Sequence, residues 1–112
     1  MQVAVIKPNM TMLLMLNVPS PPPLDFLQVA VGGPIEQVPY FNSFALEGIE
    51  KRYPAVAFCN EEGKLHGLEA SIPATLAWAE TMAIDHKAEI VDILVGNVVV
   101  IFAEDAAELE AL

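Results

Sequence analysis

The residue types that form a nucleophile and its base occur together only in Cys59 and His66. A thiol reacts as a nucleophile where a nearby base or cation stabilises its thiolate. Residues 55–68 carry two apolar arms around a polar loop, a pattern typical of a β-hairpin in which Gly63 adopts a positive φ. In that hairpin His66 faces Phe58, so the alternation of side chains places the thiol and the imidazole on opposite faces of the sheet. The sequence therefore predicts no catalytic residues and a protein that is not an enzyme.

Metal and cofactor chemistry also lacks the residues it requires. One cysteine and two histidines fall short of a zinc ligand set. The adjacent carboxylates of Glu61 and Glu62, at the tip of the expected hairpin, provide too few oxygen ligands for a hard cation. Gly32 and Gly33 are not followed by the further glycine and lysine of a nucleotide-binding loop. We therefore expect neither a metal site nor a cofactor.

The charge of the chain narrows the choice of partner. Its formal net charge is −10, from 15 acidic and 5 basic residues. From residue 60 onward, 11 acidic residues stand against two lysines, so this half carries −9. Such a field opposes direct binding to nucleic acid or an anionic membrane and steers the protein toward a basic protein surface. Mimicry of DNA charge is an alternative, and it requires carboxylates spaced along one face.

The apolar segments predict one α+β domain at residues 1–103, followed by an acidic C-terminal tail at 104–112. The expected order is ββαββαβ, with two helices and a mixed, mostly antiparallel sheet of about five strands. The expected strands are a buried hairpin of 3–6 with 12–16, an edge strand at 35–41, the hairpin arms within 55–68 and a central strand at 98–102. Residues 42–53 are expected to form an excursion from the sheet.

The two helices should differ in their exposed surfaces. The first is expected to start at a cap on Ser20 and to end at Gly32, with Leu24, Leu27 and Val31 on its buried face. The second starts at Ser71, and its stripe expected to face the sheet consists of Ile72, Leu76, Ala79 and Ala83. Trp78 and Met82 lie on another side, where they either fill a second core contact or form an exposed patch typical of protein interfaces.

Three runs along the chain resemble a known family. They are VGGPIEQVP at residues 31–39, CNEEGKLHGL at 59–68 and DILVGNVVV at 92–100. Their order is similar to that of a small domain-of-unknown-function family of bacteriophages, plasmids and actinobacteria. The chain departs from that family at residues 69–71, where the family often carries Pro-Asn, and at 42–53, which resembles an insertion. The resemblance implies a mobile-element origin and a fold, with no assigned reaction.

The leading functional hypothesis is a small acidic binding module of a phage-type element that engages or inhibits a host protein. The residues expected to contact a partner are Trp78, Met82, Glu61 and Glu62. The alternative is a protein that binds or sequesters a small molecule or nucleotide, with candidate ligand-binding residues Asn60, His66, Tyr40 and Arg52. The apolar surface of so small a domain also suggests a homodimer.

The expected location is the cytoplasm of the host bacterium. A single cysteine makes no internal disulfide, which is typical of a reducing compartment. Residues 1–9 lack the layout of a signal peptide. The apolar run at 10–18 is shorter than the ~20 residues needed to span a bilayer. No membrane partner is therefore expected.

Overall fold

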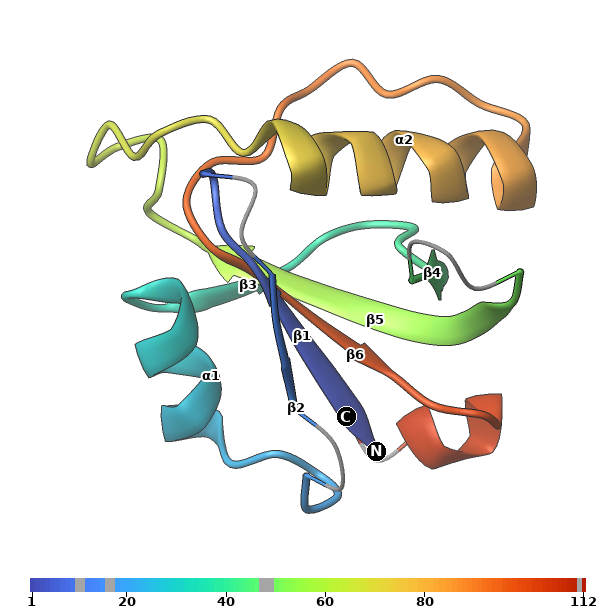
Figure 1. Cartoon of the computed structure of the whole chain (residues 1–112). Coiled ribbons are helices and arrows are strands. Elements are labelled where there is room, and N and C mark those ends of the chain that lie inside the picture. The colour runs from blue at the N-terminus through green and yellow to red at the C-terminus, as the bar shows by residue number, and fades with distance from the viewer. Residues whose placement is uncertain (10–11, 16–17, 47–49, 111) are drawn as a thin grey trace.

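The sheet is organised around its last strand in sequence, β6 (Val98–Phe102). All five of its side chains are apolar and buried, because both faces of the strand are covered. It lies between β1 (Gln2–Ile6) and β5 (Arg52–Asn60) and pairs antiparallel with both. The computed structural model of the chain describes residues 1–9, 12–15, 18–46, 50–110 and 112 (Figure 1). The predicted central strand is confirmed.

The remaining strands extend the sheet on both sides. β2 (Met12–Met15) pairs with β1, and β3 (Ile35–Gln37) pairs with β5, which gives the order β2-β1-β6-β5-β3. β4 (Ser43–Ala45) pairs antiparallel with the start of β5. The predicted α+β class, antiparallel sheet and pair of helices are confirmed. Residues 42–46 and 50–53, expected to leave the sheet, instead belong largely to β4 and β5, while 47–49 lie outside the described residues.

The two helices cover opposite faces of the sheet (Figure 1). α1 (Leu24–Val31) packs through Leu27 and Val31 onto Val99 and Ile101. The expected cap on Ser20 is wrong, because α1 begins only after Pro23 and has no side-chain cap. Leu24 is exposed, whereas the expected stop at Gly32 is confirmed by a left-handed φ of 79°.

The second helix, α2 (Ile72–His86), starts where predicted. The Ser71 hydroxyl accepts a hydrogen bond from the backbone N–H of Ala74 at 3.3 Å, which satisfies a free donor of the first turn. The predicted buried stripe is wrong: Ile72 and Leu76 are 50% and 61% exposed. The buried face carries Ala74, Trp78 and Thr81, because apolar residues surround this helix and the indole and hydroxyl find hydrogen-bond partners beneath it.

Of the hairpin predicted at residues 55–68, only the first arm is a strand. β5 ends at Asn60, and residues 61–67 coil into turns with backbone bonds such as His66 N–H to Glu62 O at 3.0 Å. β5 already pairs with β6 on one edge and with β3 on the other, so neither edge is left for a second arm. Phe58 therefore faces Gln37 and Val99 rather than His66. The positive φ in this loop belongs to Gly67, not to Gly63.

The acidic tail contains a short 3-10 helix, η1 (Ala106–Leu109). Asp105 and Glu108 form a capping box at its start. Leu109 packs against the apolar cluster on the α1 side of the sheet. None of the helices in the described residues is long and apolar enough to cross a membrane.

Candidate functional site: an acidic cleft beside Trp78

A cleft of about 240 Å³ opens where β3, the end of β5 and α2 meet the loops at 61–67 and 92–95. Its buried floor includes Trp78, Val38 and Leu94, and the half-buried thiol of Cys59 also lines it. The exposed rim carries charged side chains, namely Glu36, Glu61, Lys64 and Asp92. The cleft therefore joins an apolar, aromatic floor to a charged opening.

Asn60 holds the loop that forms one wall. Its Oδ1 accepts a hydrogen bond from the backbone N–H of Glu62 at 2.8 Å, which starts the turn that ends β5. Its Nδ2 donates to the carbonyl of Val31 at 3.3 Å, at the end of α1. A Cβ added to Gly33 would lie 2.8 Å from this Nδ2, so the glycine is needed for the close approach. Asn60, expected to bind a ligand, is thus 7% exposed and bonded within the protein.

A second asparagine acts on the same helix end. Asn97 Nδ2 donates to the carbonyl of Ala30 at 3.1 Å, one residue before the carbonyl that Asn60 holds. The last carbonyls of a helix have no hydrogen-bond donor within the helix. Here two side-chain amides from distant segments each donate a hydrogen bond to one of these carbonyls. The end of α1 is therefore tied to the wall of the cleft through Asn60 and to the residue just before β6 through Asn97.

Trp78 fixes the floor. Its indole N–H donates to the carbonyl of Pro39 at 2.9 Å, and its side chain is 7% exposed within the core on the α2 side of the sheet. Of the two alternatives for Trp78 and Met82, the structure has the core contact, since Met82 is also partly buried against that cluster. Trp78 still lines the cleft, so part of its side chain borders the space that a ligand would occupy.

The electrostatics of the cleft favour a positive ligand group. Lys64 pairs with Asp92 across the opening, which lowers the pKa of that carboxyl, and the Ile93 backbone N–H adds to the effect. Glu36 and Glu61 remain on the rim without a cation among the lining residues other than Lys64. Burial first, and then the charge of Glu36, raise the pKa of the Cys59 thiol to about 11. The thiol is therefore protonated near neutral pH and is a poor nucleophile.

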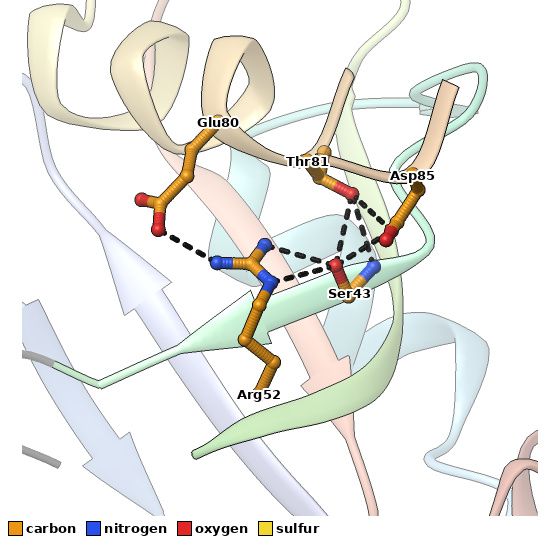
Figure 2. Close-up of polar contacts among 5 residues, drawn as sticks. All are labelled: Ser43, Arg52, Glu80, Thr81 and Asp85. Atoms are coloured by element: carbon orange, nitrogen blue, oxygen red, sulfur yellow. Dashed lines mark hydrogen bonds and ion pairs between the residues drawn. The ribbon is translucent and has the colours of Figure 1, made fainter. Parts of the chain in front are cut away.

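A polar cluster links β4 and β5 to α2, at residues of this helix that follow Trp78 (Figure 2). Asp85 Oδ2 accepts hydrogen bonds from the hydroxyls of Ser43 at 2.6 Å and Thr81 at 2.9 Å. Arg52 donates to Ser43 Oγ through Nε at 3.0 Å and Nη2 at 2.9 Å, and its Nη1 pairs with Glu80 at 2.7 Å. The hydroxyl proton of Ser43 is committed to an ionised carboxylate, so this cluster clamps α2 to the sheet rather than activating a nucleophile.

The clamp makes a prediction about acid stability. The Ser43 hydroxyl, followed by Thr81 and Arg52, holds the pKa of Asp85 below its ordinary value. The stabilisation is present above the unfolded pKa of about 3.9 and is lost as the pH falls through the lower folded pKa. Asp85→Asn should lower the urea midpoint of unfolding at about pH 7. The difference between the midpoints of the variant and wild type should shrink toward about pH 2. Urea titrations across that range test this, and a pH-independent difference would contradict it.

The other predicted site residues lie away from the cleft. The side chain of His66 is 58% exposed, and its Nε2 lies 3.6 Å from Glu62 Oε1 on the same loop. Tyr40 is 63% exposed and meets the His86 ring at 5.2 Å between centroids. Arg52 belongs to the clamp. Of the predicted residues, the structure thus brings Trp78, Glu61 and Asn60 together at the cleft.

Sequence reasoning missed Glu36, Lys64 and Asp92 as site residues, and it assigned Cys59 to the core alone. They come from separate segments, so no local spacing marks them. One signal was available: the runs at 31–39, 59–68 and 92–100 supply every lining residue except Trp78. Within the described residues, no group of three or more His, Cys, Asp or Glu side chains is placed to hold a metal ion.

The fold and the site define a small α+β domain with an acidic cleft at one end of its sheet. The chain belongs to the family described as domain of unknown function DUF3846, whose model matches residues 1–112. No curated protein matches the chain, and no solved structure matches it either.

Proposed function

We propose that this chain is a non-enzymatic binding module of a phage or related mobile element, which engages a basic segment of a host protein in the bacterial cytoplasm. An arginine or lysine side chain of that segment enters the acidic cleft and lies over Trp78. The observation that carries the proposal is the joining of a carboxylate rim, Glu36 and Glu61, to an aromatic floor. A cation gains from both, through charge attraction and through the ring face.

The charge of the whole chain supports the same partner. At −10 it attracts a basic surface over long distances and speeds the encounter, while the cleft provides the local fit. A volume of about 240 Å³ is below the range of ~300–1,000 Å³ typical of small-molecule pockets, and it suits one side chain better than a whole ligand. Nucleotides carry the wrong charge for this rim.

DNA mimicry receives less support. Exposed carboxylates lie on α1 at Asp25, on α2 at Glu80 and beside η1 at Asp105, and the two helices cover opposite faces of the sheet. A mimic of the duplex requires its charges along one face. The protein-binding proposal needs only the local charge of the cleft.

Tryptophan fluorescence tests the proposal directly, because Trp78 is the only tryptophan in the chain. A capped tetra-arginine peptide titrated into the protein at about 0.15 M salt, the same for every variant, should change this emission in a saturable way. The double variant Glu36→Gln/Glu61→Gln should weaken the apparent affinity by about tenfold or more, since it removes two charges facing the bound cation.

The matched control is Glu50→Gln/Glu110→Gln, which removes the same net charge from exposed positions outside the cleft. It should bind the peptide within about twofold of wild type at about 0.15 M salt, where distant charges are screened. Equal weakening in the two double variants would reduce the effect to net charge and overturn the proposed site. Arginine amide binding as tightly as the peptide would favour the small-molecule alternative instead.

A further inference from the structure

The two edges of the sheet differ in how they are protected. The β3 edge is three residues long, lies between Pro34 and Pro39, and exposes Glu36 and Gln37. Short length, charge and proline are the devices by which proteins prevent the pairing of an exposed strand edge. At the opposite edge, β2 (Met12–Met15) is also short, at four residues, but its sequence MLLM contains neither a charge nor a proline.

The first three side chains of β2 are exposed, and they lie on both faces of the sheet. Met12, Leu13 and Leu14 are 41%, 47% and 45% exposed. Leu13 pairs with Val5, which faces α1, so alternation places Leu13 on the α1 side and Met12 and Leu14 on the α2 side. The sequence predicts β2 as half of a buried hairpin. It pairs with β1 as expected, yet these three apolar side chains remain exposed.

An apolar groove of about 620 Å³ adjoins this edge. It runs between β2 and α1 and is lined by Leu13, Phe26 and Val29, of which Val29 is 81% exposed. Its charged lining residues are one cation, Lys7, and one anion, Asp25. On a chain of net charge −10, this surface is therefore locally neutral.

Local neutrality decides between the possible occupants. A basic partner would be attracted by the acidic cleft and not by this neutral surface. Two copies of a −10 chain, in contrast, can associate only where their surfaces do not repel each other. A strand edge is also self-complementary about a two-fold axis, because two identical strands pair antiparallel. We propose that the occupant is a second copy of this chain, joined through β2 to β2 in one continuous sheet.

The arrangement leaves the cleft free. The sheet order places β2 at one edge and β3, which lines the cleft, at the other. The dimer therefore carries its two acidic clefts at opposite outer edges, and association does not depend on whether the cleft binds a cation.

Light scattering coupled to size-exclusion chromatography should give wild type a mass twice the chain's 12.1 kDa at micromolar concentration. Leu14→Lys places a cation on the edge without touching the groove, and it should raise the dimer dissociation constant by about tenfold or more. The matched control is Leu76→Lys on α2, where a similarly exposed leucine is replaced by the same residue. This variant should remain a dimer.

Hydrogen exchange on the wild-type protein provides a measurement that needs no variant. Backbone amides within 12–15 should become more protected as protein concentration rises, while those of β3 should not change. A monomeric wild type at about 100 µM would overturn the proposal. So would a dimer that survives Leu14→Lys, a dimer lost in Leu76→Lys, or concentration-independent exchange at β2.

Discussion

Asn60→Ala should lower the free energy of unfolding by about 2–4 kcal/mol, because it removes both hydrogen bonds of a buried amide. The N–H of Glu62 and the carbonyl of Val31 would lose their side-chain partner at a site that is 7% exposed. The loop at 61–67 would also lose the contact that starts its turn. Urea denaturation followed by circular dichroism measures the loss.

Two further variants separate the roles of this side chain. Asn60→Asp keeps the acceptor for Glu62 but loses the donor to Val31, so it should destabilise the protein more when the new carboxyl is ionised than in acid. The matched control is Asn42→Ala, whose bond to His86 is exposed, and its effect should stay within about 0.5 kcal/mol. An Asn60→Ala protein as stable as the Asn42→Ala control would refute the structural role assigned to the amide.

Trp78→Ala should cost about 3–5 kcal/mol, the range typical of removing a large aromatic side chain from a core. The substitution leaves a cavity under α2 and removes the donor to Pro39. Trp78→Phe restores most of the apolar contact but not the hydrogen bond, so it should cost about 1–3 kcal/mol. Thermal or urea unfolding by circular dichroism measures both.

The control for this pair is Leu76→Ala, two residues away on the exposed side of α2. Its effect should remain below about 1 kcal/mol, since Leu76 is 61% exposed. If Leu76→Ala were as destabilising as Trp78→Ala, the orientation of α2 described here would be wrong.

The strands and helices with strong local signals were predictable from the sequence. Val98–Phe102 is apolar without interruption, and a strand of that kind must be covered on both faces. Ser71 and Pro73 mark the start of α2, and Gly32 marks the end of α1. These features depend on a few neighbouring residues, so pattern reasoning located them.

The errors arise where distant segments decide the outcome. Residues 61–68 have the pattern of a hairpin arm, but β3 and β6 already occupy both edges of β5. The face of α2 was not readable from periodicity, because apolar residues occur all round it, and the partners of Trp78 and Thr81 lie far away in the chain. The cleft combines three runs and one helix, so only its individual members Trp78, Glu61 and Asn60 were anticipated.

The position of β6 has a consequence for how the chain folds. This strand follows the other five in sequence, yet it lies between β1 and β5 and joins the two parts of the sheet. During synthesis, β1 with β2, and β3 and β4 with β5, emerge first as separate pieces that lack the middle of their core. Contacts between residues so far apart in sequence form slowly. The sheet therefore closes only after residue 102 has left the ribosome, and until then the apolar edges of β1 and β5 are exposed to aggregation.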